Sequence, residues 1–375
     1  MDIFDQIEKP TLLLDEATAR ANLSRMVAKL RALGVRFRPH FKTHQSISIG
    51  EWFRQAGVEH ITVSSLDMAR YFAGAGWQDI SLAFPANLRQ AGALGELARQ
   101  VRLHLLVESP ETVHFLGQRL EAPVELWIKI DVGNHRTGVG VDDPAAVAAV
   151  CRAAASFPHL HLRGLLTHAG QTYRAHSPEE ICRVYQASVE ALNRLRRQLA
   201  TDGIGPLEIS VGDTPACSAC TDLGAVDEAR PGNFIFYDAQ QLQTGACTAA
   251  DIAVALACPV VARHPERGEV VVYGGAIHLS KDYWVEDGEK KYGLVALPAG
   301  KRWGEPLPGA YVSGLSQEHG ILRLPAEALA RVAVGDLLCL LPAHSCLSVQ
   351  VMGSYLTLDG LAISTLNCPG RDAAA

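Results

Sequence analysis

The stretch VRFRPHFKTH (residues 35–44) opens the pattern that decides the fold. It predicts a strand over residues 35–41 that gives way to a helix. At this strand exit, Lys42 stands among two histidines and an arginine. Neighbouring positive charge and partial burial convert an ammonium group into an amine nucleophile. The alternative interpretation is a solvated basic strand end, and these residues alone leave both interpretations open.

Short apolar runs alternate with amphipathic segments through the first two thirds of the chain. The expected strands cover residues 35–41, 60–64, 80–84, 103–107, 125–131, 162–168, 207–211 and 226–230. Helical patterns lie between them, for example over residues 66–75, 145–155 and 178–199. Eight strand-then-helix units in series predict an α/β fold, a closed parallel (β/α)8 barrel of the TIM type. An open doubly wound sheet is the alternative, because the second and eighth strands carry the weakest pattern.

The pattern changes after about residue 250 to short strands separated by turns that contain Gly and Pro. The expected strands cover residues 252–262, 268–274, 292–297, 321–324, 336–341 and 348–352. They predict a mainly antiparallel β domain. We therefore expect a barrel domain over residues 16–250 and a β domain over residues 251–375, joined by the N-terminal segment 1–15 and its strand at residues 11–15.

Composition narrows the classes of partner. The 375 residues carry a formal net charge of −6, so no basic field favours nucleic acid or an anionic membrane. No apolar run reaches the ~20 residues of a membrane span, and the N-terminus lacks the basic start of a signal peptide. The nine cysteines show no framework spacing, which favours a reduced cytoplasm over a disulfide scaffold. Cys217 and Cys220 have CxxC spacing without a second pair, so we interpret them as buried helix packing.

Polar residues and glycines recur where the expected strands end. In a (β/α)8 barrel these positions meet at the face that holds the active site. The loops SVGDTP (residues 210–215) and RPGN (residues 230–233) offer small residues whose backbone N–H groups can surround phosphate oxygens. Ordinary turn chemistry explains either loop alone. Together with a lysine after the first strand, they indicate a phosphorylated cofactor held against an amine, and pyridoxal phosphate (PLP) is the obvious candidate.

A second cluster is His344-Ser345-Cys346. We expect an extended strand here, in which alternate residues share a face, so that the imidazole and the thiolate bind one ion. Two protein ligands leave coordination positions open for water or substrate, as a catalytic metal requires. Chance and core packing are the alternative explanation.

Taken together, these motifs resemble the D-threonine aldolase and D-serine dehydratase group of fold-type III PLP enzymes, which are related to alanine racemase. The resemblance runs over almost the whole chain. The matching motifs are PTLLLD (10–15), RPHFKTH (38–44), DVG (131–133) with Arg136, HAG (168–170), SVGDTP (210–215), RPGN (230–233), QEHG (317–320) and HSC (344–346). The lysine motif combined with a C-terminal His-x-Cys is fairly specific. One departure is Gln45, where family members often carry Lys or Arg.

The resemblance implies roles for individual residues. Lys42 would hold PLP as a Schiff base, and Arg230 would face the cofactor ring. The phosphate would be held by Gly212, Asp213, Thr214, Gly232 and Asn233. Further candidates for cofactor contact are His40, His168 and Tyr173, and His176 is a candidate base. Arg136 and His319 are candidates for the substrate carboxylate, with surface roles as the alternative.

The resemblance also implies a divalent metal at His344 and Cys346, next to the β-hydroxyl of a D-amino acid, and a homodimer. A thiolate favours zinc, with manganese or magnesium as alternatives. The expected reaction is dehydration of D-serine, D-threonine or D-threo-3-hydroxyaspartate to a 2-oxo acid and ammonia, with Lys42 as the base at Cα. The main alternative is retro-aldol cleavage to glycine and an aldehyde. An amino-acid racemase, a non-catalytic PLP carrier and a metal-free Schiff-base aldolase are lesser alternatives.

Overall fold

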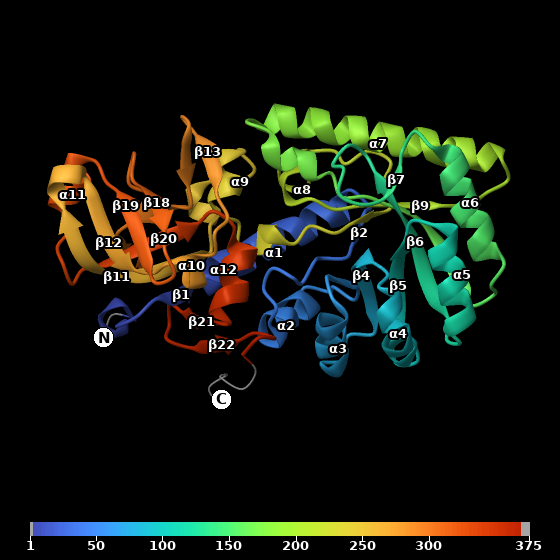
Figure 1. Cartoon of the computed structure of the whole chain (residues 1–375), viewed down its shortest axis with the longest axis horizontal. Coiled ribbons are helices and arrows are strands. Elements are labelled where there is room, and N and C mark those ends of the chain that lie inside the picture. The colour runs from blue at the N-terminus through green and yellow to red at the C-terminus, as the bar shows by residue number, and fades with distance from the viewer. Residues whose placement is uncertain (1–2, 369–375) are drawn as a thin grey trace. The chain divides into compact units, whose positions relative to one another are not determined.

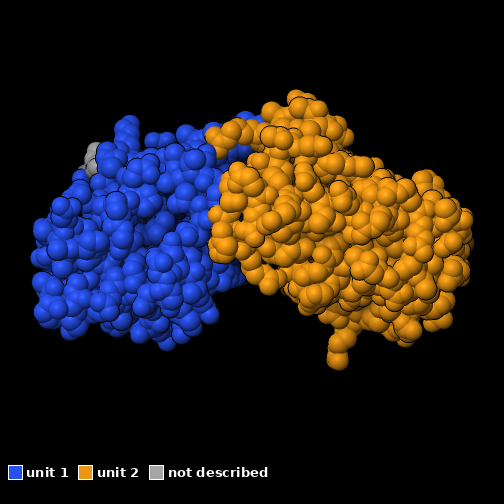
Figure 2. Space-filling view, turned by 90° about the horizontal axis from the view of Figure 1, so that it is seen from above, with its two compact units in different colours: residues 1–24, 43–52, 233–375 blue, residues 25–42, 53–232 orange. Residues whose placement is uncertain are grey.

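A computed structural model describes residues 3–368 of the chain. Its residues form two compact units that are each discontinuous in sequence (Figure 2). Residues 25–42 and 53–232 form the unit that we call the barrel unit, and residues 1–24, 43–52 and 233–375 form the unit that we call the β unit. The expected domain division at residue 250 stays a prediction, because compactness of these units does not define a domain boundary.

The barrel unit is built on eight parallel strands. They are β2 (Arg36–Phe37), β3 (Ile61–Val63), β4 (Asp79–Pro85), β5 (Arg102–Val107), β6 (Val124–Asp131), β8 (Leu160–Leu166), β9 (Glu208–Val211) and β10 (Glu228–Ala229). Their order is β2-β10-β9-β8-β6-β5-β4-β3, and a parallel bridge between His40 and Thr62 joins the two ends. The (β/α)8 barrel is therefore confirmed, and the open sheet is wrong. A short extra strand, β7 (Val139–Gly140), pairs with β6.

Helices alternate with the barrel strands along the chain (Figure 1). They are α1 (Glu16–Ala32), α2 (Ile47–Gln55), α3 (Leu66–Gly74), α4 (Ala91–Ala98), α5 (Pro110–Arg119), α6 (Pro144–Ala155), α7 (Pro178–Thr201) and α8 (Thr214–Ala219). Local sequence sets where several of them begin. Ser65, Ser109 and Ser177 each accept a hydrogen bond from the backbone N–H three residues later, and prolines occupy the first turns of α5, α6 and α7.

A buried charge network lies inside the barrel. Arg38, 2% exposed, donates to Glu228 at 2.7 Å and pairs with Asp79. His104 Nε2 lies 3.0 Å from Asp79, and its Nδ1 accepts from Trp127 Nε1 at 3.1 Å. Burial alone would raise the pKa of Glu228, but its two arginine partners lower it to about 2. The resulting stabilisation is present above the ordinary glutamate pKa and is lost as the pH falls toward about 2.

The β unit contains a nine-stranded, mainly antiparallel sheet. Its order is β12-β19-β18-β15-β20-β11-β1-β21-β22. The strands are β1 (Thr11–Leu14), β11 (Val254–His264), β12 (Glu269–Tyr273), β15 (Gly293–Ala296), β18 (Tyr311–Leu315), β19 (His319–Arg323), β20 (Leu337–Pro342), β21 (Ser354–Thr357) and β22 (Ala362–Ser364). Strand β1 pairs antiparallel with β11, so the expected joining of the N-terminal strand to the β domain is confirmed.

Small elements complete the β unit. Two hairpins consist of β13 (Trp284–Glu286) with β14 (Glu289–Lys291), and of β16 (Pro298–Ala299) with β17 (Arg302–Trp303). The helices are α9 (Ala239–Gln243), α10 (Ala276–Leu279), α11 (Ala326–Ala330) and α12 (Ser345–Met352). Among the described residues, no helix combines the length and the hydropathy that a membrane span requires.

The expected strand at residues 348–352 is wrong, because this segment belongs to α12. A short apolar run does not distinguish a strand from a helix by itself. Here Ser345, Cys346, Ser348 and Val349 are buried, which is the spacing of one helix face. The helix ends at Gly353, whose φ of +71° suits the left-handed conformation of a helix C-terminus.

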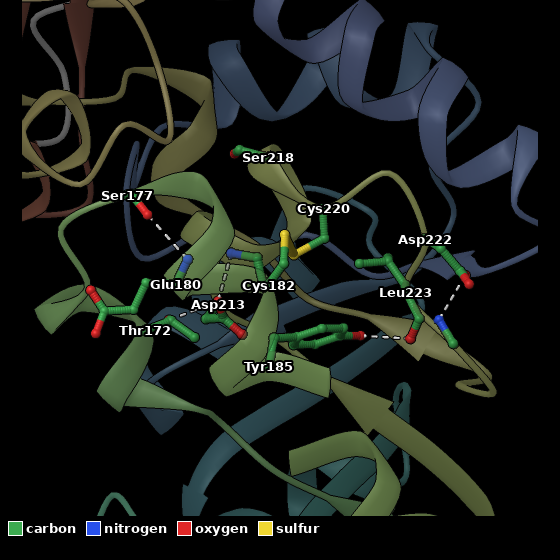
Figure 3. Close-up of a disulfide and its surroundings, with 12 residues drawn as sticks. Thr172, Ser177, Glu180, Cys182, Tyr185, Asp213, Ser218, Cys220, Asp222 and Leu223 are labelled. Atoms are coloured by element: carbon green, nitrogen blue, oxygen red, sulfur yellow. Dashed lines mark hydrogen bonds between the residues drawn. A yellow bond between two sulfur atoms is a disulfide. The ribbon is translucent and has the colours of Figure 1, made fainter. Parts of the chain in front are cut away.

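The cysteine prediction needs a correction as well. Cys182 in α7 and Cys220 after α8 form a disulfide (Figure 3). Cys217 and Cys220 are both buried, as expected, but Cys220 is also bonded to Cys182. The two bonded cysteines lie 38 residues apart, and the packing of α7 against α8 brings them together. Sequence spacing therefore gave no signal for the pairing.

The barrel network predicts the effect of replacing Glu228. The variant Glu228→Gln should lower the free energy of unfolding by about 3–5 kcal/mol, because Arg36 and the buried Arg38 both lose a buried counter-charge. The control is Glu121→Gln, since Glu121 is 83% exposed and pairs only with a surface arginine. That change should cost less than about 1 kcal/mol in urea unfolding. Equal losses in both variants would contradict a special role of the buried pair.

The disulfide predicts a thiol count. Titration of the denatured, unreduced protein should detect the seven free cysteines, and reduction should raise the count to nine. The variant Cys182→Ser should expose one new thiol, because it releases Cys220. A count of nine before reduction would show that the bond does not form in the purified protein.

Candidate active site

The first barrel strand places Lys42 through its aromatic neighbour. Phe41 is fully buried, and its ring centroid lies 4.9 Å from that of Phe72 and 5.1 Å from that of Trp77. On either side of this anchor lie His40 and Lys42, and the Lys42 N–H donates to His40 Nδ1 at 3.3 Å. The packing of Phe41 therefore fixes the backbone from which the candidate nucleophile extends.

His40 and His168 lie in one positively charged cluster with Lys42, Arg136 and Arg230. Burial and then the charge of Lys42 lower the pKa of His168 to about 3 and that of His40 well below its usual value. Both imidazoles are therefore neutral at physiological pH. His168 Nδ1 donates to the Gly212 carbonyl and His40 Nδ1 accepts, so their hydrogen bonds assign the tautomers.

Arg230 is held rigidly at the exit of β10. It is 4% exposed, its Nε donates to Ser210 Oγ at 2.8 Å, and its Nη2 donates to the Thr167 carbonyl. Ser210 Oγ in turn donates to Glu228 at 2.7 Å. The barrel charge network thus orients the arginine that sequence comparison places at a cofactor ring. Burial lowers the pKa of Arg230 to about 10, which keeps the guanidinium charged.

The loop after β9 has the features of a phosphate cradle. A Cβ at Gly212 would lie 2.9 Å from Arg230 Cβ, so only glycine fits this close approach. Thr214 Oγ1 is buried and has no hydrogen-bond partner within the described residues. A phosphate oxygen would supply the missing acceptor for that hydroxyl. These two observations fit PLP.

The side chain of Asp213 caps a helix, and its expected contact with the phosphate stays a prediction. Its Oδ1 accepts from the Ala216 N–H at 2.8 Å and from Thr172 Oγ1 at 2.9 Å, so its side chain caps α8 (Figure 3). Burial raises its pKa to about 6. A carboxylate repels phosphate, so we assign this side chain to shaping the loop. Gly232 follows Pro231, whose carbonyl accepts from the His40 N–H at 3.0 Å, and thus borders the same strand exit.

The remaining barrel candidates divide into two groups. Tyr173 lies in the 3-10 helix η3 (Gly170–Arg174), its ring 5.9 Å from that of His168, and its hydroxyl accepts from the Thr214 N–H at 3.4 Å. It is therefore part of the cradle. His176 is exposed, and its backbone N–H donates to Glu180 at 2.9 Å. Its expected function as a base gains no geometric support and stays a prediction.

Sequence analysis missed Lys129. This lysine is 7% exposed in the middle of β6, and its Nζ donates to the Ile130 carbonyl at 2.9 Å. Burial, together with Arg230 and Arg136, lowers its pKa to about 8. The signal was a lysine inside the otherwise apolar run LWIKI, which a buried strand does not normally contain.

The metal candidates lie in the β unit. His344 is the N-cap residue of α12 and Cys346 lies in its first turn, so the expected extended strand is wrong. Burial would lower the pKa of His344, but Cys346 and Asp238 raise it to about 9. Cys346 Sγ lies 3.2 Å from Thr43 Oγ1. The His344 imidazole and the buried Cys346 thiol interact, and such a nitrogen and sulfur pair fits zinc.

His344 and Cys346 supply only two ligands for a metal ion. Within residues 3–368, no group of three or more His, Cys, Asp or Glu side chains is arranged to hold a metal ion.

Asn233, expected at the phosphate, directs its side chain to other residues of the β unit: Nδ2 donates to Asp238 at 2.6 Å and to Ser345 Oγ at 2.9 Å. His319, expected at the substrate, is exposed on β19.

Comparisons with known proteins agree with this geometry. Residues 14–240 match the model of the alanine racemase N-terminal domain, and residues 253–358 match that of a putative serine dehydratase domain. The chain is 31% identical to a D-threo-3-hydroxyaspartate dehydratase of Delftia sp., over 94% of this chain and 95% of that protein. It is 26% identical to a D-serine dehydratase of Schizosaccharomyces pombe, over 96% of this chain and 90% of that protein.

A solved structure of the Delftia dehydratase covers 97% of this chain and 99% of its own, with a TM-score of 0.88 and 30% identity. A variant of that enzyme in which a cysteine is replaced by alanine is described as metal-free, and it has the same TM-score of 0.88.

The cradle predicts the effect of removing the Thr214 hydroxyl. The variant Thr214→Val should weaken PLP binding about tenfold, because a charge-assisted hydrogen bond contributes roughly 1.5–3 kcal/mol and neighbouring contacts recover part of it. The measurement is titration of the apoenzyme with PLP. Thr201→Val is the matched control, because that hydroxyl is exposed and bonds only to the Gln198 carbonyl. Equal affinities for the two variants would exclude Thr214 from the cradle.

Proposed function

Because the chain belongs to the fold-type III family of PLP-dependent lyases that act on D-β-hydroxy amino acids, we propose that it is a metal-dependent dehydratase. The reaction converts D-serine, D-threonine or D-threo-3-hydroxyaspartate to a 2-oxo acid and ammonia. The observation that carries the choice is the pairing of the half-buried His344 with the buried Cys346, in a chain whose barrel unit also holds Lys42 in a positively charged cluster.

The barrel residues support cofactor binding. Lys42 would hold PLP covalently, and Gly212 and Thr214 would bind its phosphate. Bound PLP would supply an electron sink for the charge that develops at the substrate Cα. The Lys42 Nζ would also serve as the base that takes the Cα proton. The neutral His40 and His168 flank this amine without adding positive charge.

The metal pair supports elimination of a hydroxyl group. His344 and Cys346 would hold the ion, and a thiolate ligand favours zinc over manganese or magnesium. A divalent metal supplies Lewis acidity that makes hydroxide a better leaving group. The donor set is therefore appropriate to a dehydratase, although retro-aldol cleavage at the same site remains the alternative outcome.

Other proposals have different support. A racemase needs no metal pair, and a PLP carrier needs no β unit. Each of these proposals therefore leaves one feature of the chain without a function. The net charge of −6 gives nucleic acids and anionic membranes no attraction, which supports a small D-amino acid as the ligand. We also propose a homodimer, as the resemblance implies, and a cytoplasmic location. Disulfides are rare in reducing compartments, so the thiol titration also bears on that location.

Product analysis tests the function. The purified protein is incubated with PLP, zinc and each of the three D-amino acids, and 2-oxo acid is measured against glycine. We expect 2-oxo acid, its loss with EDTA, and recovery with zinc. Glycine as the sole product would contradict the dehydratase and favour the aldolase.

Two variants separate the cofactor from the metal. Lys42→Ala should abolish both activity and the visible absorbance of lysine-bound PLP. Cys346→Ala should abolish activity but keep that absorbance, whereas Cys247→Ala serves as the matched cysteine control and should keep both. Full activity of Cys346→Ala would exclude the metal pair from the reaction.

A further inference from the structure

A fully buried carboxylate, Asp238, lies behind the metal pair and has no part in the chemistry described so far. Its two oxygens have separate partners. Oδ1 accepts from the Gln241 N–H at 3.0 Å and caps α9. Oδ2 accepts from Asn233 Nδ2 at 2.6 Å and from the Ser345 N–H at 3.0 Å. The carboxylate thus connects α9 to the turn that begins α12.

Helix capping does not explain why this residue is a carboxylate. A single side-chain oxygen is enough for an N-cap, and serine fills that position for α3, α5 and α7 in this chain. Burying a charged group without a counter-charge is costly. The second oxygen therefore needs a reason of its own, and that reason lies among its neighbours in the β unit.

The cationic neighbour is His344. Its Nδ1 lies 3.5 Å from Asp238 Oδ2 and is buried without a hydrogen-bond partner in the described part of the chain. A metal-bound imidazole uses one ring nitrogen for the metal, and its other N–H normally bonds to a carboxylate, a carbonyl or water. The orientation of His344 toward Asp238 assigns Nδ1 to the carboxylate and leaves Nε2 for the metal.

Two further side chains fix Asp238 Oδ2. Ser345 Oγ accepts from Asn233 Nδ2 at 2.9 Å and lies 3.4 Å from Oδ2, to which it donates. Asn233, Asp238 and Ser345 therefore form a closed triangle of hydrogen bonds. Because the triangle is buried and each member is hydrogen-bonded, the carboxylate oxygen has little freedom to turn away from His344.

We propose that Asp238 is a positioning residue for the metal: it orients His344 through Nδ1, and Asn233 and Ser345 hold it in place. The inference rests on the proposed function, because it takes the metal at His344 and Cys346 from there. Asp238 does not touch the metal in this account. It raises metal affinity by selecting the ring orientation and tautomer that bind.

The test is the variant Asp238→Asn, which keeps a good helix cap and removes the charge. Zinc affinity of the holoenzyme is measured by competition with a chromophoric chelator. It should fall about 10- to 100-fold, the usual effect of losing such a partner, while the absorbance of bound PLP stays unchanged. The matched control is Asp15→Asn, because Asp15 is another buried cap that accepts from the Thr18 N–H at 3.0 Å. Zinc affinity there should stay at the wild-type value.

The ligand-field spectrum of bound cobalt(II) is a measurement that general destabilisation of the fold would not change. At saturating cobalt(II), the ligand-field spectrum should change in Asp238→Asn and stay as in the wild type in Asp15→Asn. If Asp238→Asn does not fold, Ser345→Ala replaces it and should weaken zinc binding several-fold. Unchanged zinc affinity in the folded variant would overturn the inference.

The variant His344→Ala distinguishes this failure from failure of the proposed function. If His344→Ala binds zinc as the wild type does, the metal site itself is wrong. If His344→Ala loses zinc and Asp238→Asn keeps wild-type affinity, only the positioning function is wrong.

Discussion

The buried ion pair of Arg38 and Glu228 is the interaction on which the barrel depends. Arg38 follows the first barrel strand and Glu228 lies in the last, and these two strands are neighbours in the sheet. Both charges are out of water, and each has a second partner, Asp79 for Arg38 and Arg36 for Glu228. Removing one member would therefore disturb a network of buried charges.

That contact also reaches the candidate site. Glu228 accepts from Ser210, and Ser210 accepts from Arg230, so a chain of hydrogen bonds runs from this buried pair to Arg230 at the candidate cofactor site. Gly212 then brings the backbone close to Arg230. The pocket is therefore preorganised by groups whose primary task is structural. The β unit repeats this arrangement, since one oxygen of Asp238 caps a helix and the other faces His344.

Sequence alone predicted the barrel because most of its strands are short apolar runs, each followed by a helical pattern. It overestimated the first strand, where the regular strand is limited to Arg36–Phe37 and His40 forms an isolated bridge. Pro39 lacks the N–H that a continued ladder requires. Helix α12 was mistaken for a strand because an apolar run of this length does not identify its own period.

The site was predictable where a motif is contiguous, as at Lys42 and at His344 with Cys346. It was not predictable where function depends on contacts between distant segments. Asp238 lies 107 residues from Ser345, and Asn233 lies 112 residues from it. Lys129 was missed although the apolar run around it carried a signal, because its charged neighbours Arg230 and Arg136 come from other segments of the chain.

The most direct test of the central claim, one chain that holds both a lysine-bound cofactor and a thiolate-bound metal, is a crystal structure of the zinc- and PLP-loaded protein with anomalous data at the zinc edge. We expect continuous density between Lys42 Nζ and PLP, and a zinc peak at His344 Nε2 and Cys346 Sγ. A cofactor attached to Lys129, or zinc bound away from the His344–Cys346 pair, would contradict the account.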